Sequence, residues 1–162
     1  APSVMFRYMF NKQHVLMFRY RGRSSTPNIE DLQEVIDITD PMNLRYGNPN
    51  LKPSFNNNFT LDYRKFVPES MRSYSANLYY TSTLNSVANR MTYDPQTGAR
   101  VYKKENVNGN WQARGFFSFN TPLKNKKFTI SSNTNARFSD AVSYTSVGSS
   151  KNADQELSTT HN

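Results

Sequence analysis

Residues 73–84 read SYSANLYYTSTL, and this stretch decides the expected fold. Tyr74, Ala76, Leu78 and Tyr80 stand at every second position, with Ser75, Asn77, Tyr79 and Thr81 between them. A period of two puts successive side chains on opposite faces of a β-strand. The stretch therefore predicts a long strand with one apolar face and one polar face.

The same alternation recurs in both directions from this stretch. Strands are expected at residues 3–10, 14–21, 59–66, 73–84, near 100–105, 111–120 and 127–138, with positions 87 to 93 continuing the alternation of the central strand and the last strand reaching toward Tyr144. Gly98 suits a positive φ in a hairpin turn at residues 94–98, and Gly109 indicates a bulge or bend. Short turns are expected at residues 11–13, 67–72 and 121–126, with a long polar connection at residues 22–58.

Strand length and the order of the connections indicate the architecture. Strands of soluble proteins usually span ~3–10 residues, and the last three strands predicted here run past that length. The short turns all fall at one end of the strands, while residues 22–58 and the 94–98 hairpin fall at the other, as in transmembrane barrels. The expected fold class is all-β: an antiparallel up-and-down meander of about six long strands, forming part of a transmembrane β-barrel. Aromatic girdles are expected near the strand ends, at Tyr63, Phe66, Phe117, Phe119 and Phe128.

Composition agrees with this class. Hydrophobic residues make up 36% of the 162 residues and aromatic residues 14%, and a disordered chain would be poor in aromatics. There is no cysteine, and no apolar run reaches the ~18 residues of a membrane helix. The N-terminus has no initiator Met and no signal pattern, which indicates a processed chain or a fragment. Basic residues are scattered and cluster only at Lys124, Lys126 and Lys127, so the net charge of +8 does not predict nucleic-acid binding.

The long external loop, residues 22–58, carries its own signals. Residues 25–27, Ser-Thr-Pro, favour a helix start, and Ile29, Leu32, Val35 and Ile36 share one helical face, so a helix of two or three turns is expected. Residues 40–41 end the helix, and the segment Gly47–Pro53 is rich in turn formers. Residues 1–146 form the barrel segment, and residues 147–162 form a polar tail that is expected to be frayed.

Residues 40–53, DPMNLRYGNPNLKP, resemble an external loop of the outer-membrane β-barrel family of TonB-dependent-receptor-like proteins, which carry a Gly-Asn-Pro-x-Leu-x-Pro stretch. The segments 20–32, 58–63, 107–111 and 119–123 are similar to the same family, and the resemblance covers residues 3–146. It implies a barrel of typically 22 strands, an N-terminal plug domain and a TonB-type energy-coupling partner. The chain departs from this pattern in lacking a plug, a TonB-contact segment and a terminal aromatic strand, so active transport is not carried over to it.

The sequence offers few candidate catalytic residues. The only histidines are His14, by a turn, and His161, in the tail, so a nucleophile–histidine pair has little support. The acid pairs Glu30/Asp31 and Asp37/Asp40 fit a solvated loop helix with acids near its N-terminus. The chain is therefore expected to be non-enzymatic, with no cofactor and no metal.

The expected function is that of a wall segment in an outer-membrane receptor or transporter for nutrient or solute uptake. Outer-membrane lipid is the expected surrounding, and the open sheet edges allow self-association. Candidate ligand-binding residues lie in the external loop and on the polar face. On the polar face Asp62 and the arginines are expected to form a charge ladder, with ordinary polar lining as the alternative. For the loop, the alternative is a turn with a structural role only. A soluble antiparallel β-domain that binds glycans or proteins is the alternative function. The candidate residues are Tyr46, Asn48, Asn50, Arg64, Arg114 and Arg137.

Overall fold

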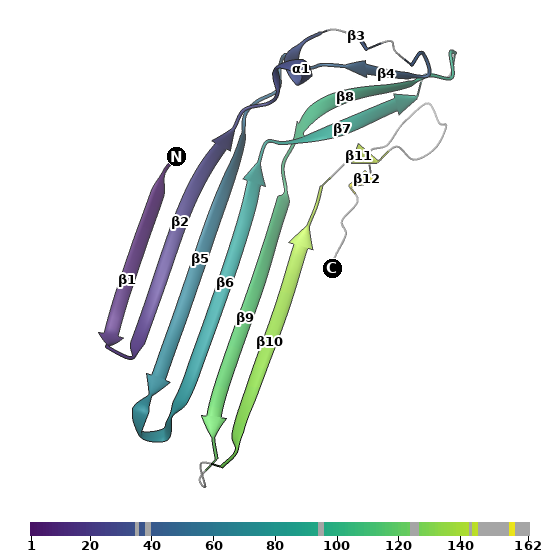
Figure 1. Cartoon of the computed structure of the whole chain (residues 1–162). Coiled ribbons are helices and arrows are strands. Elements are labelled where there is room, and N and C mark those ends of the chain that lie inside the picture. The colour runs from purple at the N-terminus through teal and green to yellow at the C-terminus, as the bar shows by residue number, and fades with distance from the viewer. Residues whose placement is uncertain are drawn as a thin grey trace.

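The computed structural model describes residues 1–34, 36–37, 40–93, 96–123, 127–142, 144–145 and 156–157. Six long strands form one sheet in the order β1-β2-β5-β6-β9-β10 (Figure 1). Every neighbouring pair in this sheet is antiparallel, which confirms the expected meander. The strands are β1 Ser3–Asn11, β2 His14–Ser25, β5 Ser54–Val67, β6 Arg72–Leu84, β9 Asn110–Pro122 and β10 Thr129–Asp140.

The three short connections lie together at one end of this sheet, the lower end in Figure 1. A two-residue turn joins β1 to β2, and the 3₁₀ helix η1, Pro68–Ser70, joins β5 to β6 through Met71 at φ 51°. The third turn is closed by Leu123 N–H donating to Phe128 O at 2.8 Å. Lys124 and Lys126 of the expected basic cluster lie outside the described residues. The longer excursions leave from the opposite end, as the sequence predicted.

The long connection is shorter than predicted, because β2 and β5 extend beyond the alternating pattern. The pairing continues to Ser25 and Ser54, so the connection spans residues 26–53 and not 22–58. Polar side chains support this extension: Thr81 Oγ1 donates to Asn58 at 3.0 Å, and Thr83 Oγ1 donates to Asn56 at 2.7 Å. Beyond the band that faces lipid, both faces of a barrel strand contact water, so polar residues occupy both. The alternation in the sequence therefore ends before the backbone pairing does.

A second sheet covers that end of the molecule, in the order β3-β4-β8-β7 (Figure 1). Strands β3 (Ile36–Asp37) and β4 (Asn43–Tyr46) come from the long connection, and β7 (Ser86–Tyr93) and β8 (Arg100–Val107) form a hairpin. β4 pairs with β8 in parallel, so this second sheet, which was not predicted, is mixed and differs from the antiparallel meander of the long strands. We call the four strands and α1 (Ile29–Leu32) the cap.

A bend separates the cap from the long sheet. Asn85, at φ 51°, divides the predicted continuous strand of residues 73–93 into β6 and β7, and Gly109, at φ 108°, divides the returning strand at the same level. Asn85 N–H donates to Asn108 Oδ1 at 2.7 Å, and Asn106 Nδ2 donates to Asn85 O at 2.9 Å. The bend predicted at Gly109 is confirmed. Gly98, at φ 73°, has the expected positive φ, while Asp94 and Pro95 lie outside the described residues.

The predicted helix is present in the long connection, but its predicted length of two or three turns is wrong. The helix α1 has four residues, because Gln33 already adopts an extended conformation with ψ 130°. Ile36 pairs with Tyr46 in the β3–β4 ladder, so sheet pairing replaces helical hydrogen bonding there. Val35, which was expected on the same helical face, lies outside the described residues.

In the described part of the chain, the six-stranded sheet is a single layer, with no second sheet against either face (Figure 1). Among the described residues the buried apolar side chains are Leu51, Ala99 and Val107, which lie in the cap or next to it. The ring side chains of the long strands are therefore not interdigitated inside a compact globule. Beyond β10, a two-residue strand β11 (Tyr144–Thr145) pairs with β12 (Glu156–Leu157), and the rest of the expected frayed tail lies outside the described residues.

Within the described part of the chain, no helix has the length and apolar character needed to cross a membrane.

Candidate functional site

The register of the long sheet puts its apolar side chains on one face. Phe18, Leu61 and Leu78 are direct neighbours across β2, β5 and β6, and the row continues through Gly115 and Ala136. Leu61 and Leu78 remain exposed, because none of the described residues packs over them on this face. A row of large apolar groups and small residues, with no charge, is typical of a surface that faces hydrocarbon.

Rings border this row on the side of the cap. Tyr20 and Phe59 have ring centroids 5.0 Å apart, Phe59 and Tyr80 6.0 Å, and Tyr80 and Trp111 6.1 Å. This band was not predicted, since its members are dispersed over four strands and only the register aligns them. Toward the short turns, Tyr74 and Phe119 pair at 5.0 Å and Phe10 stacks on His14 at 4.1 Å.

The distance between the two bands of aromatic rings fits the thickness of the apolar part of a membrane. Trp111 and Phe119 are eight residues apart on β9, which is roughly 26 Å along a strand. Strand tilt shortens this to roughly 20 Å along the barrel axis, close to the ~25 Å apolar band of outer-membrane barrels. Phe66, one of the predicted girdle residues, points to the opposite, polar face, because it is paired with Ser73.

The polar face is dominated by arginine. Seven arginines of the long strands share it by alternation and register, and Asp62 is the acid that accompanies them within these strands. Asn, Gln, Ser and Thr fill most remaining positions, as expected for a hydrated barrel lumen. The arginines are Arg7, Arg19, Arg21, Arg23, Arg64, Arg114 and Arg137.

Asp62 is held by one of these arginines. Arg19 Nη2 donates to Asp62 Oδ2 at 2.8 Å, with the Asp62 side chain 7% exposed and that of Arg19 50% exposed. Removing the cation leaves a buried carboxylate without a partner, whereas removing the acid leaves an arginine that water can solvate. The two substitutions therefore have unequal costs.

We expect Arg19→Met to lower the free energy of unfolding by about 2–4 kcal/mol, near the range for breaking a buried pair. Asp62→Asn is expected to lower it by about 1 kcal/mol or less, because the remaining charge is half exposed. Urea unfolding of the protein in lipid vesicles measures both. Equal losses for the two variants would mean that the attraction within the pair, and not the burial of Asp62, controls stability.

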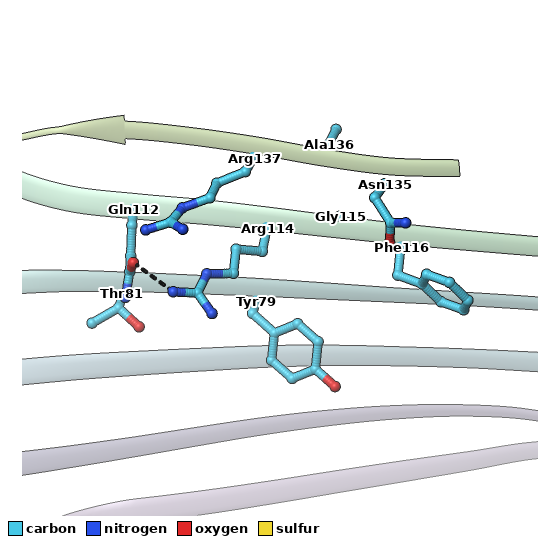
Figure 2. Close-up of a pocket in the computed structure, with 9 residues that line it drawn as sticks. All are labelled: Tyr79, Thr81, Gln112, Arg114, Gly115, Phe116, Asn135, Ala136 and Arg137. Atoms are coloured by element: carbon cyan, nitrogen blue, oxygen red, sulfur yellow. Dashed lines mark hydrogen bonds between the residues drawn. The ribbon is translucent and has the colours of Figure 1, made fainter. Parts of the chain in front are cut away.

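A cavity of about 570 Å³ lies on the polar face, over β6, β9 and β10 (Figure 2). Arg114 and Arg137 stand directly opposite each other on β9 and β10, and both guanidinium groups extend toward Gln112. Arg114 Nη2 donates to Gln112 Oε1 at 3.2 Å. The residues that line this cavity, called here the arginine pocket, are Tyr79, Thr81, Gln112, Arg114, Gly115, Phe116, Asn135, Ala136 and Arg137.

The arginine pocket contains two of the six predicted ligand residues. Arg64 shares the polar face but is paired with Val15 and Ser75, away from this cavity. Tyr79 and Phe116 were not among the predicted ligand residues, yet both line the pocket. Alternation had placed them on the polar face, but only the strand register reveals that they flank the two arginines.

The three predicted loop residues lie in the cap, apart from the arginines. Asn48 Nδ2 donates to Lys104 O at 2.8 Å, and Asn48 Oδ1 accepts from Asn50 N–H at 3.0 Å. The first bond fastens residues 47–53 to β8 and the second closes a turn within them, which supports the structural interpretation of Asn48 and Asn50. Tyr46 lines a separate cavity of about 850 Å³ between the long connection and β8.

The acids of the cap cavity are engaged locally. Asp31 forms an ion pair with Lys104 Nζ. Asp40 accepts from Asn43 Nδ2 at 2.7 Å and from Met42 N–H at 3.0 Å, and these bonds, the Asn43 bond first, hold the pKa of Asp40 below its usual value. Glu30 and Asp31 lie in the first turn of α1, as expected, and Asp31 also pairs with Lys104, whereas Asp40 stabilises a turn outside the helix. In the described part of the chain, no group of three or more acids and histidines could hold a metal ion.

A single antiparallel sheet with a hydrocarbon-facing side, ring bands and a hydrated polar side defines the wall of a transmembrane β-barrel. The model of the outer membrane protein beta-barrel family matches residues 1–162, and the chain belongs to that family. Its location is the outer membrane. No curated protein and no solved structure matches the chain. The single layer and the family membership together exclude the soluble β-domain alternative.

Proposed function

We propose that this chain forms part of the wall of an outer-membrane receptor or transporter for nutrient or solute uptake, and that it acts without catalysis. The supporting observation is the continuous polar face, on which seven arginines and the arginine pocket stand behind a lipid-facing surface. Solute meets the cap first, where the cavity beside Tyr46 opens, and then the lumen wall.

The proposal includes the partners that such a wall needs. β1 and β10 each have one neighbour in the six-stranded sheet, so barrel closure requires further strands at both edges. We propose that the lumen is closed by a plug domain and that a TonB-type partner supplies energy, in line with the resemblance at residues 40–53. If the sheet is isolated from such neighbours, its free edges would promote edge-to-edge self-association.

The test compares cells that lack the gene with the same cells carrying it on a plasmid, using a panel of labelled solutes too large for general porins. We expect lower accumulation of at least one solute without the gene, restoration by the plasmid, and loss of uptake on adding a protonophore. Unchanged uptake of every solute would overturn the transport role. Uptake that resists the protonophore would overturn the TonB-type partner alone.

A further inference from the structure

The arginine pocket combines two cations for which the described residues provide no anion. Arg114 and Arg137 are a directly opposed cross-strand pair, and like charges in this position repel each other. Arg114 donates to the neutral Gln112, and among the described residues Arg137 has no carboxylate within ion-pair distance. The acid of this face, Asp62, is already paired with Arg19 on another strand. The repulsion is therefore uncompensated by the described protein groups.

The pocket also supplies the groups that complete an anion site. Figure 2 shows both guanidinium groups pointing the same way along the wall, beside Gln112 and above Tyr79. Guanidinium groups bind phosphate and carboxylate oxygens through paired N–H donors, and amide side chains such as Gln112 and Asn135 donate to oxygens as well. Tyr79 and Phe116 add ring faces for the uncharged part of a solute. The cavity, at about 570 Å³, has the size of a small-molecule site.

We propose that Arg114 and Arg137 form an oxyanion-binding subsite for the anionic group of a solute in the barrel lumen; this proposal rests on the proposed uptake function and names its substrate class. The solute presents a phosphate or carboxylate group to the two guanidinium groups and Gln112. The other lumenal arginines raise the local concentration of anions, and the pocket selects among them. The pocket lies between the cap cavity and the short turns, so it is placed on the path from the cell exterior.

Inorganic phosphate is the probe, titrated calorimetrically into the full-length protein in detergent at constant ionic strength set with potassium chloride. Saturable binding is expected. Arg137→Gln and Arg114→Gln are each expected to weaken it at least about tenfold, since each removes charged hydrogen bonds. Arg137→Lys, which keeps the charge but loses the planar fork, is expected to give an intermediate loss.

Arg7→Gln is the matched control, because it removes the same charge from the same face of the sheet. Arg7 lies on β1, at the edge of the sheet opposite to β10. It is expected to change phosphate affinity by less than about twofold. Equal weakening by all three glutamine variants would show that only the general positive field acts, and would overturn the subsite. Absence of saturable phosphate binding by the unmodified protein would overturn it too, as when an acidic side chain from elsewhere in the protein already fills the pocket.

The two proposals fail separately. If the gene-deletion experiment shows an uptake defect while phosphate binding is absent or insensitive to Arg137→Gln, the anion subsite is wrong and the transport role stands. If phosphate binds with the expected dependence on the two arginines while no solute depends on the gene, the transport role is wrong and the subsite stands. Folding of each variant is checked by its shift on an unheated denaturing gel.

Discussion

Replacing Leu78 with arginine is expected to lower the free energy of unfolding by about 2–4 kcal/mol, because a cation near the middle of the lipid-facing band must leave water. Leu78 lies in the row between the two ring bands, beside Leu61 and Gly115, and the residue is 49% exposed on a face that no described residue covers. A large loss at such an exposed position has no explanation in a soluble protein, where surface substitutions change stability by roughly 0.5 kcal/mol or less.

The adjacent residue on the same strand provides the matched control. Asn77 points to the polar face, next to Asp62 and Phe116. Asn77→Arg therefore places the same cation at the same level of the barrel wall, but on the side that faces water. Its expected cost is within roughly 1 kcal/mol. Leu78→Ala separates the loss of apolar contact from the burial of charge. Urea unfolding in lipid vesicles measures all three, and a reversed order of Leu78→Arg and Asn77→Arg would invert the assignment of the two faces.

The sequence is informative about the long strands because the membrane imposes a local rule. Each of the residues Phe59, Leu61 and Tyr63 needs an apolar exterior regardless of its cross-strand partner, so alternation reveals the strand and its two faces. The cap obeys no such rule. The β4–β8 pairing joins Asn43–Tyr46 to residues 100–103, two short mixed segments whose contact depends on the bend at Asn85. No local pattern encodes that contact.

The candidate site illustrates the same limit. Alternation places Arg114 and Arg137 on the polar face, but their alignment depends on where the β9–β10 turn is centred. The pairing of Pro122 with Thr129 brings Arg114 opposite Arg137. A turn at residues 121–126, as predicted, would have aligned Arg114 with Asn133. An error of two residues in the predicted turn centre is therefore enough to miss the pocket, because it leaves the two arginines unaligned.

Gly47→Ala is expected to separate residues 47–53 from the end of α1, because no space exists for a methyl group there. A Cβ on Gly47 would lie 1.9 Å from the backbone oxygen of Gln33 and 3.1 Å from that of Asp31. Both are backbone atoms, which cannot rotate away, and the neighbouring Asn48 N–H donates to Asp31 O at 2.7 Å. The clash is expected to cost about 3 kcal/mol, the upper end for overpacking, and so to raise the open population of the connection on the order of 100-fold.

Trypsin added to intact cells measures this opening at the Arg45–Tyr46 bond, just before the glycine, because the proposed function places the cap at the cell exterior. Lys52 offers no cleavage site, since Pro53 follows it. Substitutions at two other glycines provide comparisons with smaller expected effects. At Gly22 the nearest atoms to a Cβ are in the side chains of Phe55 and Pro2, at 2.6 and 2.9 Å, which can move, so Gly22→Ala is expected to have a smaller effect. At Gly115 a Cβ meets nothing within 4 Å, so Gly115→Ala is expected to leave cleavage unchanged. Equal cleavage of the Gly47 and Gly115 variants would mean that residues 47–53 are not fastened to the cap, and the structural role assigned to Asn48 would fail with it.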